Sequence, residues 1–302
     1  MPSYQNTRKI CFLLLSILAL LVWSCKSGTN TKQSNSKRES YELDTVSFLI
    51  QYDGSLFAMP SPYQVAQLVK SNNIPFNESI LNNPENAKRY NTNFKKALNF
   101  GVYGTNLSYL NIYNRTPESI AYLNVLKKLS EELGINSAFD AELFKKIENN
   151  ISNQDSLLII LSSSYRRVDG FLRENDRSDV GSLILAGGWV ESLYLLTTIA
   201  QSSSNRETIN RIGEQKHPLD NLIEVLSPLY YKSTEYTVLV DKLIDLAYEF
   251  DGIIYSYSYK EPIIDEENKL TYINSQSRVI MSEYHLDIIS QKIEDIRSLI
   301  IE

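Results

Sequence analysis

Residues 179–201 read DVGSLILAGGWVESLYLLTTIAQ, and this stretch decides the fold. One stripe of it has helical spacing: Leu185, Trp189, Leu193, Leu196 and Ala200. Further apolar side chains cover the other sides of the same helix. A helix that is apolar nearly all round is buried on every face. The stretch therefore predicts a central helix that other helices must surround.

The segments on both sides of this helix also carry helix signals. Residues 116–118 read TPE, which places an N-cap hydroxyl, a first-turn proline and an acid at a helix start, and Gly134 ends that element. Helical spacing continues in further segments, namely 61–69, 87–113, 139–148, 153–172, 219–229, 236–250 and 289–300, while residues 45–52 favour a strand or an extended lead-in. The sequence predicts a mainly α fold, a multi-helix bundle.

Residues 253–276 interrupt this rhythm. Tyr255, Tyr257 and Tyr259 alternate with serines, which is a strand pattern. The acidic stretch 265–268, DEEN, lacks the spacing of a calcium loop and indicates a solvated turn. We expect a minor β-hairpin or irregular excursion here, and a helix continuing from Phe250 is the alternative. The three tyrosines are candidate ligand-binding residues that would stack a sugar or a peptide, with packing against the bundle as the alternative.

Two short segments resemble each other. Residues 101–110, GVYGTNLSYL, align with residues 187–196, GGWVESLYLL, and share a glycine, an aromatic residue and two leucines at matching positions. One interpretation is a duplication, in which two pseudo-repeated helical units pack together. The other is chance similarity between apolar helices.

The central helix carries the best candidates for a site. Each of Gly187 and Gly188 destabilises a helix interior by ~1 kcal/mol relative to alanine. A favourable contact that only glycine permits must offset this loss. Such a contact is the close approach either of a ligand beside Trp189 or of another helix at Gly101. We favour the helix crossing. Glu191 is the candidate for a catalytic acid, because burial would raise its pKa unless a base such as Arg167 pairs with it. Structural pairing is the favoured interpretation.

Composition excludes several chemistries. The only cysteines are Cys11 and Cys25, so the chain beyond residue 25 has no disulfide and no thiol nucleophile. His217 and His285 are too few for a typical histidine zinc site, and we expect no metal and no cofactor. A net charge of −6 without a basic stripe argues against nucleic acid as a partner. No phosphate loop, nucleophile elbow or HExxH motif occurs. The sequence therefore favours a non-enzymatic protein over an enzyme and leaves both interpretations open.

The N-terminus predicts where the protein resides. Arg8 and Lys9 precede an apolar run over residues 10–23, which is shorter than the ~20 residues of a membrane span. The run ends in LVWSC at residues 21–25, which resembles the lipobox of bacterial lipoproteins, with Trp23 as the one departure. The resemblance implies a signal peptide over residues 1–24 and a Cys25 acylated with several chains such as palmitate. An uncleaved apolar anchor is the alternative.

The residues after Cys25 complete the expected organisation. Residues 25–44 form the lipidated cysteine and a polar tether with too few apolar groups to fold, and residues 45–302 form the helical domain. No acidic cluster follows Cys25, which by analogy with Bacteroidota-like lipoproteins favours the periplasmic face of the outer membrane. Twenty tyrosines against ten phenylalanines suit partly exposed grooves. We expect a non-enzymatic envelope module that binds a protein or a small ligand, with a periplasmic enzyme built around Glu191 as the alternative. The expected partners are the lipid membrane and envelope proteins.

Overall fold

The computed structural model describes residues 48–52, 55–59, 68–69, 73–203 and 205–302. All of them belong to one compact unit, Val46–Glu302. The predicted signal peptide, Cys25 and the tether lie outside the described residues. So does most of the helix expected over residues 61–69, of which only Leu68 and Val69 are described, both as helix.

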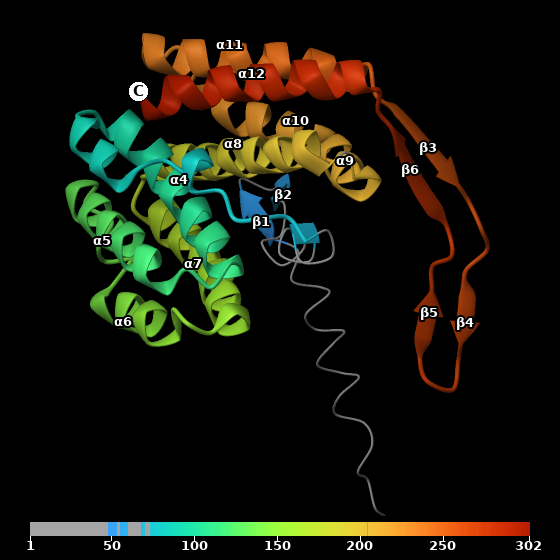
Figure 1. The fold of residues 1–302 in the computed structure, drawn as a ribbon, viewed down its shortest axis with the longest axis horizontal. Helices are drawn as coiled ribbons and strands as arrows, with labels where there is room; N and C mark the ends of the chain where they lie inside the picture. The colour runs from blue at the N-terminus through green and yellow to red at the C-terminus, as the bar shows by residue number, and fades with distance from the viewer. Residues whose placement is uncertain (1–47, 53–54, 60–67, 70–72, 204) are drawn as a thin grey trace, which may run out of the picture. The chain divides into compact units, whose positions relative to one another are not determined.

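The fold is mainly α-helical with small two-stranded sheets, as the sequence predicted (Figure 1). The α-helices are α4 (Asn93–Ile112), α5 (Thr116–Glu132), α6 (Ala141–Asn150), α7 (Gln154–Glu174), α8 (Ser178–Ser203), α9 (Arg206–Gly213), α10 (Lys216–Leu226), α11 (Thr234–Asp251) and α12 (Glu283–Ile301). The 3₁₀ turns are η1 (Glu78–Ile80), η2 (Pro84–Arg89) and η3 (Ser227–Leu229). The antiparallel strand pairs are β1 (Phe48–Tyr52) with β2 (Ser55–Met59), β3 (Ile254–Ser258) with β6 (Gln276–Ile280), and β4 (Ile263–Asp265) with β5 (Leu270–Tyr272).

Helix α8 lies at the centre of the described domain. It packs against α4, α7, α9, α10 and α12, and the side chains of Trp189, Val190 and Leu193 are fully buried. Within the described part of the chain, α8 is the one helix with the length and hydropathy that a membrane crossing would need, and 89% of its apolar window is covered by the rest of the fold. Its apolar character is accounted for by contact with neighbouring helices on all sides.

The predicted glycine crossing is confirmed, and it joins α4 to α8. A Cβ atom on Gly187 would lie 2.6 Å from the carbonyl carbon of Leu98, and one on Gly101 would lie 2.5 Å from the amide nitrogen of Gly188. No side chain fits between the two backbones at this point. The two similar segments, residues 101–110 and 187–196, therefore lie on the two helices of this one crossing.

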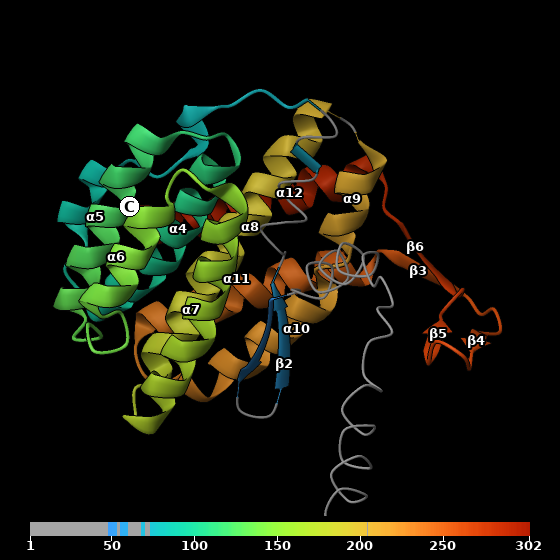
Figure 2. The same cartoon turned by 90° about the horizontal axis from the view of Figure 1, so that it is seen from below.

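Three details differ from expectation. The helix expected over residues 87–113 begins only at Asn93, because residues 84–89 form η2 and the Thr92 hydroxyl accepts a hydrogen bond from Lys95 N at 3.1 Å as the N-cap. His217 lies in α10, although its position before Pro218 predicts a loop. The helical alternative beyond Phe250 is wrong, since α11 ends at Asp251 and a β-ribbon follows. This ribbon, residues 254–280, is called the arm, and it leaves the helices beside α9 (Figures 1 and 2).

Candidate functional site

A buried ion pair joins three helices at the middle of the domain. Glu191 on α8 is 0% exposed, and both of its carboxylate oxygens accept hydrogen bonds. Arg297 on α12 donates from Nε to Oε2 at 2.6 Å and from Nη2 to Oε1 at 3.1 Å. Asn106 on α4 donates from Nδ2 to Oε1 at 2.5 Å. A buried charge is tolerated when it is paired and hydrogen-bonded in this way.

The arginine of this pair has further partners. Its guanidinium carbon lies 4.1 Å from the ring centroid of Tyr194, and Nη2 donates to the carbonyl oxygen of Ile80 at 2.8 Å. Burial alone would lower the pKa of Arg297, but the negative charge and hydrogen bonds of Glu191 outweigh it and raise that pKa. The partner of Glu191 is thus Arg297, whereas the expected base was Arg167, whose side chain lies outside the described set.

The same network holds the segment that contains η1 and η2. Asn82 donates its backbone N–H to Asn106 Oδ1 at 3.0 Å, and its side-chain amide donates to Tyr90 Oη at 2.9 Å and to Asn99 Oδ1 at 3.1 Å. These bonds, together with the hydrogen bond that Arg297 donates to the carbonyl oxygen of Ile80, hold residues 78–84 against α4 and α12. Glu191 therefore acts as a positioning residue for this segment, and neither of its oxygens is left to meet a substrate.

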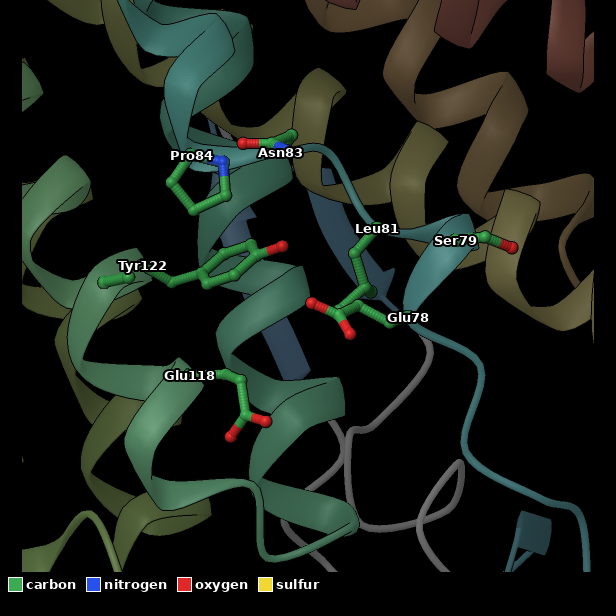
Figure 3. A pocket seen from close by; sticks show the side chains of 8 residues that line it. Glu78, Ser79, Leu81, Asn83, Pro84, Glu118 and Tyr122 are labelled. Atoms are coloured by element: carbon green, nitrogen blue, oxygen red, sulfur yellow. The ribbon is translucent and has the colours of Figure 1, made fainter.

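A pocket of about 630 Å³ lies between the fixed segment and α5 (Figure 3). Its size falls in the range of small-molecule sites, ~300–1,000 Å³. The segment contributes Glu78, Ser79, Leu81, Asn83 and Pro84, and α5 contributes Glu118, Ala121 and Tyr122. The pocket thus combines two carboxylates and a phenol with an apolar wall.

Tyr122 is the buried polar group of this pocket. The residue is only 5% exposed, its ring packs on Tyr103 with centroids 5.9 Å apart, and its hydroxyl has no hydrogen-bond partner among the described residues. Burial raises the pKa of Tyr122, and the negative charges of Glu78 and Glu191 raise it further. The phenol is therefore neutral, and it is able both to accept and to donate a hydrogen bond.

Of the two carboxylates, only Glu78 brings uncompensated negative charge to the pocket. Glu118 pairs through Oε1 with Arg115, while its Oε2 is buried and meets no donor in the described structure. Glu78 is exposed at the lip and has no ion pair with any described residue. Figure 3 shows the Glu78 carboxylate and the Tyr122 hydroxyl reaching into the same space from opposite walls.

The candidates named from the sequence lie elsewhere. Trp189 is fully buried in the core, two residues from Glu191 on α8, and neither lines the pocket. Tyr255, Tyr257 and Tyr259 lie on the arm and are 44%, 64% and 71% exposed. The pocket itself was missed, although Glu118 and Tyr122 stand four residues apart and so share one face of the predicted helix.

The donor set of the pocket suits an organic cation better than a metal. Across the described residues, no group of three His, Cys, Asp or Glu side chains is placed to hold a metal ion. Calcium takes ~6–8 oxygen ligands, which two carboxylates and a phenol do not supply.

No protein-family model, curated protein or solved structure matches this chain.

Proposed function

We propose that this chain is a lipid-anchored envelope lipoprotein whose helical domain binds, without catalysis, a primary ammonium group carried on a flexible apolar chain, such as a lysine side chain. One observation carries the proposal. The unpartnered hydroxyl of Tyr122, a residue only 5% exposed, faces the uncompensated carboxylate of Glu78 across the pocket of about 630 Å³ (Figure 3).

The chemistry of the pocket matches that ligand group by group. An ammonium has three N–H donors and no acceptor, and the pocket offers the Glu78 carboxylate and the Tyr122 hydroxyl as acceptors for two of them. The methylene stem of the ligand would lie along Leu81 and Pro84, which line the same pocket. Binding is favoured over catalysis at Glu191, because both oxygens of that carboxylate are already engaged.

Glu78→Gln is expected to weaken binding of Nα-acetyl-lysine amide about tenfold, measured by isothermal titration calorimetry. The substitution keeps the shape of the side chain but removes a charge-assisted hydrogen bond, worth ~1.5–3 kcal/mol before screening of this exposed carboxylate. Tyr122→Phe keeps the buried ring and removes only the hydroxyl, so a smaller loss of affinity is expected.

Three controls accompany this titration. Glu85→Gln removes an exposed acid that pairs with Lys88 outside the pocket, and its affinity should equal that of the parent chain. Nα-acetyl-norleucine amide lacks only the ammonium and should not bind. Calcium chloride should not compete. Equal binding of the norleucine compound, tighter binding of calcium, or no effect of Glu78→Gln would each refute the assignment.

The proposed anchor depends on Cys25. Each buried methylene of an acyl chain contributes ~0.8 kcal/mol, so one chain holds reversibly and several hold firmly. Metabolic labelling with an alkynyl palmitate analogue should mark the wild-type chain. The labelled chain should be found in the membrane fraction. Cys25→Ala should abolish the label. A mature chain that begins elsewhere, with an unmodified thiol at residue 25, would contradict the lipoprotein assignment.

A further inference from the structure

A second pocket, of about 430 Å³, lies between the segment that carries η1 and helix α8. Its apolar wall consists of Ile74, Pro75, Ile80, Tyr109 of α4 and Ile199 of α8. None of its described lining residues is charged. The volume falls in the range of small-molecule sites, ~300–1,000 Å³, and the lining suits a neutral apolar group.

The rim of this second pocket carries polar groups that match a peptide backbone. Asn77 Oδ1 accepts hydrogen bonds from the backbone N–H of Ser79 at 3.0 Å and from its hydroxyl at 2.7 Å. The amide NH₂ of Asn77 has no partner among the described residues, so it is able to donate to a carbonyl. Thr198 and Ser202 donate their hydroxyl protons to carbonyl oxygens of α8 at 2.9 and 2.8 Å. Their oxygens are therefore able to accept from an N–H.

A single 3₁₀ turn separates the second pocket from the pocket of about 630 Å³, which is called the cation pocket. Asn77 and Ile80 line the second pocket, whereas Glu78, Ser79 and Leu81 line the cation pocket. Neighbouring residues at η1 therefore belong to different pockets. Three residues of a 3₁₀ helix rise about 6 Å, so the two pockets are adjacent subsites of one surface.

Side-chain contacts hold the wall between the two pockets in place. The ring of Phe76, which precedes η1, packs on the ring of Tyr109 with centroids 5.8 Å apart. The guanidinium carbon of Arg115 lies 4.8 Å from the centroid of the Phe76 ring, and Arg115 pairs with Glu118 of the cation pocket. The backbone N–H of Asn77 donates to the Tyr109 hydroxyl at 3.3 Å. A continuous set of contacts thus joins the linings of the two pockets.

An extended peptide has the geometry to occupy both pockets at once. Residues i and i+2 of an extended chain point to the same face, and residue i+1 points to the opposite face. The Cα atoms of residues i and i+2 lie about 7 Å apart, which is close to the length of η1. A lysine and an apolar residue two positions from it would both face the protein, and the residue between them would face solvent.

We propose that the two pockets together bind one extended peptide segment, with a lysine in the cation pocket and a leucine-like side chain two positions away in the second pocket. This inference rests on the proposed function, because it extends the same ligand. The Asn77 amide and the hydroxyls of Thr198 and Ser202 would contact the backbone of the peptide.

The test is isothermal titration calorimetry with acetylated and amidated tripeptides. Either Lys-Gly-Leu or Leu-Gly-Lys, according to the direction of the bound chain, should bind at least about tenfold more tightly than Lys-Gly-Gly, because a leucine side chain is buried. Lys-Leu-Gly has the composition of Lys-Gly-Leu but directs its leucine to the opposite face. Its affinity should therefore equal that of Lys-Gly-Gly.

A variant of the second pocket locates the gain. Ser202→Trp places an indole at the mouth of this pocket, at an exposed position of α8. It should remove the gain from leucine and leave the affinity for Lys-Gly-Gly unchanged, which also shows that the variant folds. Gln201→Trp is the matched control, since Gln201 is exposed and does not line the pocket, and it should keep the gain.

The titrations separate this inference from the proposed function. Binding of Lys-Gly-Gly that depends on Glu78, with no gain from leucine at the i+2 spacing, would overturn the peptide site and leave the cation pocket standing. A gain that is equal at both spacings, or one that survives Ser202→Trp, would do the same. If no lysine peptide bound, both the proposed function and this inference would be wrong.

Discussion

Arg297→Met is expected to lower the free energy of unfolding by about 3–5 kcal/mol, because it leaves the Glu191 charge buried without its counter-ion. Glu191 is fully buried, and Arg297 supplies two of its three hydrogen bonds. The same change releases the carbonyl of Ile80, so the lip of the pocket loses one attachment. Urea unfolding followed by circular dichroism measures the first effect, and titration of Nα-acetyl-lysine amide measures the second.

A double variant separates the charge effect from a simple loss of packing. Glu191→Leu together with Arg297→Met removes both charges, and its stability should exceed that of Arg297→Met alone, since an apolar pair often replaces a buried ion pair at little cost. Lys88→Met breaks an exposed pair with Glu85 and should leave stability unchanged. If Arg297→Met unfolded at the same urea concentration as the wild type, the buried pair would have no structural role.

Gly187→Ala is expected to cost at least about 1–3 kcal/mol, because overpacking of a core contact strains the structure. The added Cβ would lie 2.6 Å from the carbonyl carbon and 2.9 Å from the Cα of Leu98, so α4 and α8 would have to separate. Backbone atoms are on both sides of this contact, so a rotamer change cannot relieve it. Thermal unfolding by calorimetry measures the loss.

Gly170→Ala is the matched control for that substitution. Gly170 lies in α7, and a Cβ atom there would meet nothing within 4 Å. Alanine should therefore stabilise the chain by about 0.4–1 kcal/mol through a less flexible unfolded state. Equal effects at the two glycines would show that α4 and α8 do not approach as closely as the structure places them.

The helical framework was predictable because its signals are local. The all-round apolar pattern of residues 179–201 requires a buried helix, and the glycine at 187 requires close approach by some neighbour. The tyrosine alternation at 255–259 indicated a strand in the same way. Each of these inferences needs only residues within one element, and the structure bears each of them out.

The site was not predictable because its parts come from distant segments. Arg297 is 106 residues from Glu191, and the residues of η1 have no periodicity that marks a pocket wall. One signal was present and unused: Arg297 follows Ile293 by four positions, so it lies on the buried face of the C-terminal helix. A charged residue on a buried stripe requires a partner of opposite charge. Glu191 was the acid expected to be buried, and Arg297 is a better-placed partner for it than Arg167, the base expected from the sequence.

A crystal structure of the chain with Nα-acetyl-lysine amide bound would examine the pocket directly. The ammonium nitrogen should lie about 3 Å from a carboxylate oxygen of Glu78 and at similar distance from the Tyr122 hydroxyl, with the stem of the ligand along Leu81 and Pro84. A ligand seated elsewhere, or a pocket that holds only water while Glu78 turns away from Tyr122, would contradict the proposed function.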